Sequence, residues 1–138
     1  CQVELFNTGA LTNDSKYCVI TEGEFDCLSF ETVGVNAIGL SSANNVNKFI
    51  EREKSLDKTF ILALDNDEAG QIAAKALIEY FDENNINYCT FDNCGYKDAN
   101  QALVSDKEKF TDEINKIVFP LIKEREHRKA RQFDDEME

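Results

Sequence analysis

The hydrophobic residues of this chain fall into short, nearly continuous runs that alternate with longer amphipathic segments. The short runs lie at 17–21, 36–40, 60–64 and 86–91, and segments with helical spacing separate them at about 25–33, 45–54 and 69–82. Short apolar runs of this kind are typical of strands that are covered on both faces of a parallel sheet. Strands that alternate with helices predict repeated βαβ units with right-handed crossovers. We therefore expect an α/β fold with about four parallel strands and helices on both faces.

The helical spacing also predicts which side chains face the core. In the first helix, Phe25 and Leu28, together with Ser29 and Thr32, are spaced to share one face. The helix that begins at Ala69 has a longer apolar side, formed by Ile72, Ala73, Ala76, Leu77, Tyr80 and Phe81.

The C-terminal third of the chain reads as helix. Residues 97–104 predict a short helix with Asp98 as its N-cap, and a longer helix is expected over 106–133. Its first apolar face is marked by Phe110, Ile114, Ile117 and Leu121. Pro120 is expected to kink or split this helix. Beyond Lys123 nearly every residue is charged, which is typical of a solvated helix, a frayed end or a connector.

The domain organisation follows from these segments. We expect a lead-in over 1–16 with a strand or turn at Val3 to Phe6, one α/β domain over 17–105, and a C-terminal helix with a charged tail over 106–138. A chain of 138 residues is long enough for one compact domain and too short for two ordinary ones. Because it opens at Cys1 without methionine, we expect a piece of a longer protein, whose tail could connect to a missing domain.

Composition excludes several classes of protein. The net charge of -12 excludes a broad basic face for nucleic acid, so a polyanionic partner must be met through cations, a local basic patch or another protein region. The five cysteines are odd in number and contain no C-x-x-C pair, which argues for reduced thiols in a cytoplasmic protein. No apolar run approaches the roughly 18 residues of a membrane span, so no membrane partner is expected.

Acidic residues follow two of the predicted strands directly. The run that begins at Tyr17 leads into Glu22-Gly23-Glu24-Phe25-Asp26, and the run that begins at Phe60 leads into Asp65-Asn66-Asp67. The carboxyl ends of parallel strands share one edge of a sheet, about 5 Å apart for neighbouring strands, and ligands bind at that edge in open α/β sheets. Glu22, Asp65 and Asp67 are therefore expected to converge. Clustered carboxylates repel one another, and a hard cation such as Mg²⁺ or Mn²⁺ relieves that repulsion.

Each acidic motif also has a purely structural explanation when it is taken alone. Asp26 could sit in the first turn of a helix, where the helix dipole favours a negative charge. The D-N-D stretch, followed by Glu68 and Gly70, could be an N-cap cluster ahead of the helix that begins at Ala69. Gly23 and Gly70 could serve only as turn residues. Capping does not require the acids to follow strands, however, so both motifs together favour the convergent site.

These residues carry a resemblance to a known family. The E-G-x-x-D stretch of Glu22, Gly23 and Asp26, followed about 43 positions later by the D-x-D of Asp65 and Asp67, resembles the hallmarks of TOPRIM domains over about 17–104. The continuation Glu68-Ala69-Gly70 is similar to the form found in bacterial and phage DNA primases and primase-helicases. Lys97 and Asp98 match the start of a primase K-D-P-D-E stretch, from which the chain departs at Ala99 and Asn100.

The resemblance implies a Rossmann-like TOPRIM fold and assigns expected roles to the matching residues. Asp65 and Asp67 would be metal ligands, and Glu22 would be either a ligand or the group that assists deprotonation. The supporting residues would be Gly23, Asp26, Gly70 and Asp98, with Asp26 orienting Glu22 or its loop. Lys97 is expected to contact a nucleoside triphosphate, with a solvated loop lysine as the alternative.

The function implied by the resemblance is RNA primer synthesis for DNA replication. In that reaction a 3'-hydroxyl attacks an α-phosphate in a nucleotidyl transfer that depends on Mg²⁺ or Mn²⁺. The expected partners are a single-stranded DNA template, nucleoside triphosphates, and a replicative helicase or a fused helicase domain. Because no zinc module or basic template-binding region is evident, this piece alone is expected to be weakly active or inactive. The alternatives are a metal-dependent nuclease of the same fold and a non-catalytic docking module of a replication protein.

Overall fold

The chain folds around one sheet of four parallel strands. The computed structural model describes residues 4–52 and 57–137, with side chains described as far as Lys123. The strands are β1 (Tyr17–Thr21), β2 (Ala37–Gly39), β3 (Thr59–Leu62) and β4 (Tyr88–Thr90), in the spatial order β2-β1-β3-β4. All three neighbouring pairs are parallel. This arrangement confirms the predicted fold, and it places β1 and β3 side by side at the centre of the sheet.

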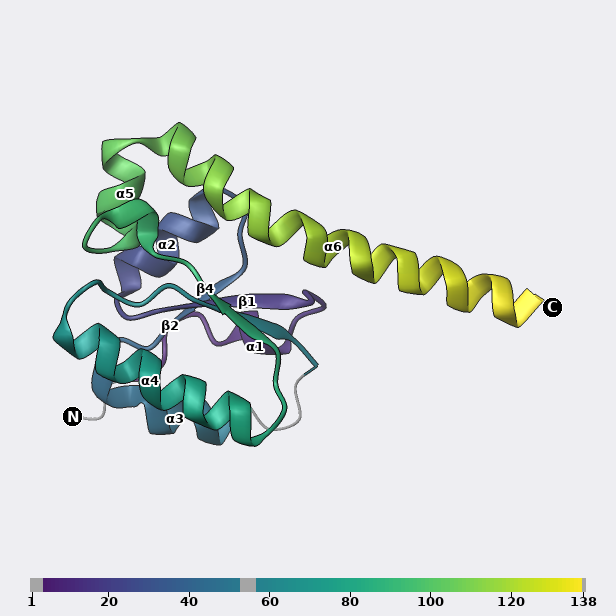
Figure 1. Cartoon of the computed structure of the whole chain (residues 1–138), viewed down its shortest axis with the longest axis horizontal. Helices are drawn as coiled ribbons and strands as arrows, with labels where there is room; N and C mark the ends of the chain where they lie inside the picture. The colour runs from purple at the N-terminus through teal and green to yellow at the C-terminus, as the bar shows by residue number, and fades with distance from the viewer. Residues whose placement is uncertain (1–3, 53–56, 138) are drawn as a thin grey trace.

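Helices cover both faces of the sheet (Figure 1). The short helix α3 (Val46–Arg52) and the long helix α4 (Glu68–Glu83) pack on one face, near α1 (Gly9–Thr12). On the other face lie α2 (Glu24–Thr32), α5 (Ala99–Ser105) and the first part of α6 (Lys107–Met137). Two 3-10 turns, η1 (Ala43–Asn45) and η2 (Asn93–Gly95), lie in the connections.

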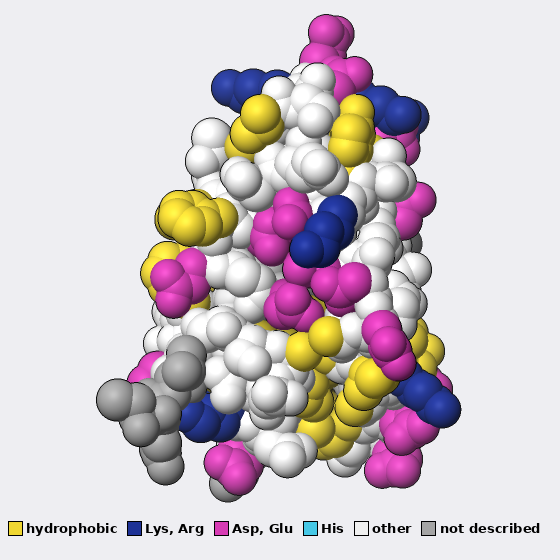
Figure 2. Space-filling view, turned by 90° about the vertical axis from the view of Figure 1, so that its left-hand side faces the viewer, with side chains coloured by type: hydrophobic (Ala, Val, Ile, Leu, Met, Phe, Trp, Pro, Cys, Tyr) yellow, Lys and Arg dark blue, Asp and Glu magenta, His cyan; other side chains and the backbone are white. Residues whose placement is uncertain are grey.

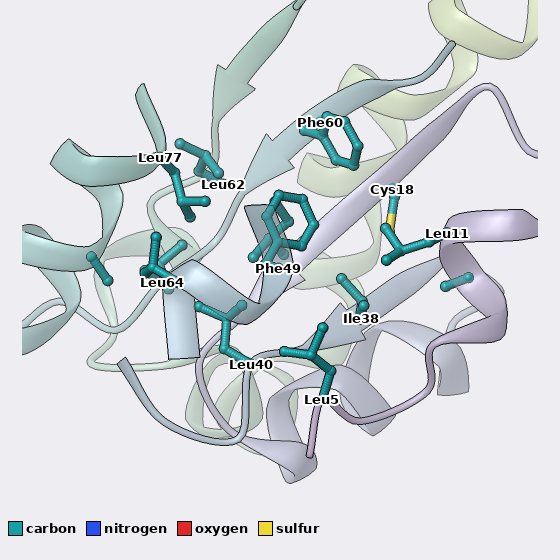
Figure 3. Close-up of a cluster of buried hydrophobic side chains, with 14 of the residues drawn as sticks. Leu5, Leu11, Cys18, Ile38, Leu40, Phe49, Phe60, Leu62, Leu64 and Leu77 are labelled. Carbon is teal, nitrogen blue, oxygen red and sulfur yellow. The ribbon is translucent and has the colours of Figure 1, made fainter. Parts of the chain in front are cut away.

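Each face of the sheet has its own hydrophobic layer, because successive side chains of a strand point to opposite faces. Phe60 and Leu62 belong to the layer that also contains Phe49 and Leu77, from α3 and α4 (Figure 3). Phe60 stacks on Phe81 of α4 with ring centroids 5.2 Å apart. Ile61 points the other way, into the layer that contains Phe30 and Phe110. The central strands are thus buried on both sides, as their continuous apolar sequence predicts.

The N-terminal segment packs against the edge strand β2. The backbone of Phe6 forms an isolated antiparallel bridge with Gly39, through hydrogen bonds of 2.8 and 2.9 Å, while Leu5 and Leu11 are buried in the core. The predicted strand or turn in this region is therefore a single bridge at Phe6 followed by a helical turn. Val3 lies outside the described residues.

The predicted core face of α2 is correct for Ser29, which is buried, and wrong for Phe25 and Leu28. Phe25 and Leu28 are 75% and 46% exposed, while Cys27 and Phe30 are fully buried. The buried side of α2 also carries polar groups, since Ser29 Oγ lies 2.8 Å from the carbonyl of Phe25 and 3.2 Å from Oδ1 of Asn100. Asn100 of α5 provides hydrogen-bond partners for Ser29 and Asp26 on the buried side of α2. This polar contact takes the place of an apolar one, and Phe25 and Leu28 are left in solvent.

Two further expectations are corrected in the helices. Ile72 is 64% exposed and Ala76 is exposed, so the core side of α4 is narrower than predicted. Pro120 does not split α6, which is assigned as one helix from Lys107 to Met137. Proline deprives the carbonyl of Lys116, one turn earlier, of its helical partner. Both residues are exposed, so water can satisfy that carbonyl and the helix continues.

Within the described part of the chain, no helix combines the length and the apolar character that crossing a bilayer would require.

Candidate functional site

The acidic residues after β1 and β3 meet at the carboxyl edge of the sheet. Tyr17 to Ile20 pair with Thr59 to Leu62, and a further bond of 2.9 Å joins the amide of Ala63 to the carbonyl of Ile20. This register brings Glu22 beside Asp65 and Asp67, and one carboxylate oxygen from each of the three lies within 4.8 Å of the others. The predicted convergence of these three side chains is therefore present in the structure.

A second group of acids adjoins the first and shares Asp65 with it. One carboxylate oxygen each from Asp26, Asp65 and Asp98 again lies within 4.8 Å of the other two. Asp26 comes from the first turn of α2 and Asp98 is the N-cap of α5, so each supporting acid is brought in by a helix. Together these five carboxylates form what we call the acidic centre: Glu22, Asp26, Asp65, Asp67 and Asp98.

The turn after β1 is held by side chains on either side of Gly23. The buried hydroxyl of Thr21 lies 3.0 Å from the carbonyl of Gly23. Asp26 is only 6% exposed and accepts a hydrogen bond of 2.9 Å from the backbone N–H of Asn100. A Cβ on Gly23 would lie 3.2 Å from the Asp26 carboxylate. Asp26 thus ties the Glu22 turn to α5, which fits the orienting role expected of it.

The turn after β3 combines a helix cap with a close backbone approach. Asp67 Oδ1 accepts a hydrogen bond of 2.8 Å from the N–H of Gly70, so Asp67 is the N-cap of α4 as well as a member of the acidic centre. A Cβ on Gly70 would lie only 2.0 Å from the carbonyl oxygen of Asp65. Glycine is therefore required at this position for steric reasons, although its backbone is helical.

Asn66, which the sequence did not mark, fastens the loop that carries Lys97 and Asp98. Its side-chain amide donates to the carbonyls of Asp92 (2.8 Å) and Tyr96 (2.6 Å), and its backbone N–H donates to the carbonyl of Lys97 (2.7 Å). These three bonds join the middle of the D-x-D turn to the segment before α5. The only sequence signal was its place between two aspartates, which does not identify a loop partner 26 to 30 residues away.

The electrostatics of the acidic centre are unfavourable in the absence of a cation. Burial, followed by the nearby carboxyl of Glu22 and the charges of Asp98 and Asp67, raises the pKa of Asp65 to about 7. Burial also raises the pKa of Asp26 to about 6, because it outweighs the hydrogen bond from Asn100, and the charges of Asp98 and Asp65 add to the rise. The N-termini of α2, α4 and α5 at this edge offset part of the repulsion, at about 0.3–1 kcal/mol for each helix end.

The donor set fits a hard divalent cation. Glu22 Oε1 and Asp65 Oδ1 are shielded from solvent, and neither has a hydrogen-bond partner among the described residues. Buried oxygens without a donor are costly unless something positive reaches them. Around an octahedral Mg²⁺, opposite oxygens lie about 4.2 Å apart and adjacent oxygens about 2.9 Å apart, so three oxygens that lie within 4.8 Å of one another would close on one ion by up to about 2 Å. Carboxylate oxygen is also the ligand type that Mg²⁺ and Mn²⁺ prefer.

The face that carries the acidic centre is seen directly in Figure 2, where acidic side chains gather near the middle with a basic side chain beside them. Lys97 is exposed next to Asp98, and it forms no ion pair with any residue that the structure describes. Its position is compatible with both alternatives, contact with a triphosphate and a solvated lysine.

Ser42, after β2, caps η1 by accepting a hydrogen bond of 3.2 Å from the N–H of Asn44.

Comparison with solved structures places this fold beside the primase part of a phage replication protein. The primase fragment of the bacteriophage T7 primase-helicase matches with a TM-score of 0.62 and 24% identity, over 79% of this chain and 47% of that one. A second match has a TM-score of 0.56 and 22% identity, over 78% of this chain and 55% of the other. It is a structure of the T7 lagging-strand DNA polymerase with primase domains of two gp4 subunits, bound to an RNA/DNA hybrid and dTTP. The chain thus spans about half the length of these solved chains.

The sequence itself gives the family. No curated protein shows significant similarity to the chain. The profile of the Toprim-like family, however, matches residues 19–103, a span that contains all five carboxylates of the acidic centre. This match confirms the predicted resemblance to a TOPRIM domain, and the fold is like that of the phage primase fragment. The chain belongs to the Toprim-like family.

Proposed function

We propose that this chain is the TOPRIM domain of a DNA primase and takes part in Mg²⁺- or Mn²⁺-dependent nucleotidyl transfer during RNA primer synthesis. The observation that carries the proposal is the convergence of Glu22, Asp65 and Asp67, whose ligand oxygens lie within 4.8 Å of one another at the carboxyl edge of the sheet. Membership of the Toprim-like family and the likeness of fold to a phage primase fragment support it.

The residues divide into those that would hold the cation and those that position them. Asp65 and Asp67 would be ligands, and Glu22 would be a third ligand or would take the proton from the attacking hydroxyl. A bound divalent cation would lower the pKa of that hydroxyl and neutralise charge on the phosphate. Asp26 keeps the Glu22 turn against α5, and Asn66 keeps the loop of Lys97 and Asp98 against the D-x-D turn. Lys97 would contact the triphosphate.

The rest of the machinery would come from other protein regions. With a net charge of -12, this chain needs another region to hold a single-stranded DNA template, and a replicative helicase or a fused helicase domain would be its partner. The matched solved chains are about twice the length of the part that aligns. We therefore expect these 138 residues alone to show weak primer synthesis or none.

Cation binding is the first test, because it does not depend on the missing regions. Calorimetric titration with Mn²⁺ should show binding to the chain, and Asp65→Ala or Asp67→Ala should abolish or strongly weaken it. Asp112→Ala, which removes an exposed acid on α6, is the matched control and should bind as the unaltered chain does. If Mn²⁺ does not bind, or if the three variants behave alike, the chain is better described as a non-catalytic docking module.

Product analysis separates primer synthesis from the related nuclease reaction, in which water replaces the 3'-hydroxyl. With Mg²⁺, a single-stranded template and labelled nucleoside triphosphates, the parent protein that contains this chain should build short oligomers. Degradation of the template without any incorporation would favour the nuclease.

A further inference from the structure

A cavity of about 220 Å³ opens at the same edge of the sheet as the acidic centre, between α4 and the strands β3 and β4. Its walls include the buried side chains of Leu62 and Leu64, together with Ala74 of α4. Polar groups at its margin include Gln71 of α4 and Thr90 of β4, both of which are exposed. Neither the roles assigned to the acids nor the family resemblance uses this cavity.

The cavity adjoins the turn that carries two of the candidate cation ligands. Asn66, which stands between the ligands Asp65 and Asp67, is itself one of the residues that line it. Gln71 lies one turn of α4 beyond Asp67, and its N–H bonds to the carbonyl of Asp67 at 3.0 Å. One turn is about 5.4 Å along the helix axis. The cation ligand Asp67 and the residue Gln71 at the margin of the cavity are therefore about one helical turn apart along α4.

We propose that this cavity receives the nucleobase of a nucleoside triphosphate whose phosphates are held at the acidic centre, an inference that rests on the proposed function. A base has apolar faces and a polar edge, and the cavity offers Leu62, Leu64 and Ala74 to the faces, with Gln71 and Thr90 for the edge. The volume also fits one base. Pockets for drug-sized ligands usually measure about 300–1,000 Å³, so this smaller cavity suits a fragment such as a single ring system.

The test compares a nucleoside triphosphate with a ligand that lacks the nucleoside. The ¹⁵N-labelled chain is titrated with Mg·ATP, and separately with Mg²⁺ and inorganic triphosphate, while amide chemical shifts are followed. Both ligands should shift the amides around Asp65 and Asp67, whereas only Mg·ATP should shift those of Gln71, Ala74 and Thr90. We expect Mg·ATP to bind about tenfold more tightly than inorganic triphosphate, the ratio that about 1.4 kcal/mol provides.

Variants of α4 locate the effect. Ala74→Phe should fill the cavity and bring the two affinities close to parity while leaving triphosphate binding intact. Ala76→Phe, at an exposed position of the same helix, should keep the preference for Mg·ATP. If Ala74→Phe does not fold, Gln71→Leu at the exposed margin replaces it and should reduce the preference.

The outcomes separate the two levels of the proposal. Equal affinity of the unaltered chain for both ligands, or an undiminished preference in Ala74→Phe, overturns the base site while cation and phosphate binding still stand. If neither Mg²⁺ nor phosphate shifts the amides around Asp65 and Asp67, the proposed function fails, and the base site fails with it.

Discussion

Replacing Asp65 by asparagine should stabilise the cation-free protein. Burial and neighbouring carboxylates raise the pKa of Asp65 to about 7 from an ordinary value of 3.8. At about 1.36 kcal/mol for each pKa unit, ionising this residue costs the folded state about 4 kcal/mol more than the unfolded state. Part of the carboxyl group is open to water, which screens the interaction, so we expect about 1–2 kcal/mol to be measurable. Asparagine keeps the shape of the side chain and removes the charge.

The effect should depend on pH in a definite direction. Because the folded-state pKa is raised, the folded protein binds more protons than the unfolded chain between about pH 4 and pH 7, and its stability falls as the pH rises through that window. The asparagine side chain has no proton to lose. The variant should therefore match the unaltered chain near pH 4 and exceed it by about 1–2 kcal/mol at pH 8, which is a rise in Tm of about 3–6 °C for a domain of this size.

The assay is thermal unfolding followed by circular dichroism at pH 4 and pH 8, with a chelator present. Asp112→Asn removes an exposed acid elsewhere and should leave Tm nearly unchanged at both pH values. Adding Mg²⁺ at pH 8 should raise the Tm of the unaltered chain more than that of Asp65→Asn, because ligand binding stabilises the folded state. A lower Tm for Asp65→Asn at pH 8, or an equal shift at both pH values, would refute the electrostatic account of the acidic centre.

Three other substitutions follow from the structure. Gly70→Ala should destabilise the fold by about 3 kcal/mol in urea unfolding, because its Cβ would lie 2.0 Å from the carbonyl oxygen of Asp65. Asn66→Ala should speed amide exchange over 92–98 and weaken Mn²⁺ binding about tenfold, because it removes two hydrogen bonds that hold this loop. Lys58→Met should cost about 2 kcal/mol in the same unfolding assay, because the buried ammonium donates to carbonyls of Asn13 and Ser15.

Each of these substitutions has a matched control. Gly9→Ala has open space around its Cβ and should be close to neutral. Asn84→Ala removes the hydrogen bond that the Asn84 side chain donates to the carbonyl of Tyr80 at the exposed end of α4, and it should leave Mn²⁺ affinity unchanged. Lys16→Met breaks an exposed ion pair with Asp57 and should cost less than about 1 kcal/mol. If a control matched its partner variant in any of these assays, the corresponding structural reason would be wrong.

Sequence patterns predict those parts of the fold that depend on local periodicity. The four strands could be predicted because apolar runs mark them, and β1, β2 and most of β3 are buried. The convergence of Glu22 with Asp65 and Asp67 follows from parallel strands that share an edge. The role of Asp98 as the N-cap of α5 could also be predicted from the sequence, because capping depends on residues that are close together in the chain.

Features that depend on distant partners were not accessible from the sequence. The inward face of α2 was mispredicted because the N–H that satisfies Asp26 belongs to Asn100, 74 positions away. The role of Asn66 likewise depends on carbonyls in a loop near β4. The continuity of α6 through Pro120 depends on which side of the helix faces water, and local propensity does not report that.

The position of β1 and β3 at the centre of the sheet has a consequence for the choice of ion. Each central strand is bonded to a neighbour on both sides, which limits how far apart the turns after β1 and β3, with Glu22 and Asp65, can move. Calcium needs metal–oxygen distances of about 2.3–2.6 Å and more ligands than the compact shell of about 2.0–2.1 Å around magnesium. If a cation binds between these turns, their limited movement should disfavour Ca²⁺ relative to the smaller Mg²⁺, although both ions carry the same charge.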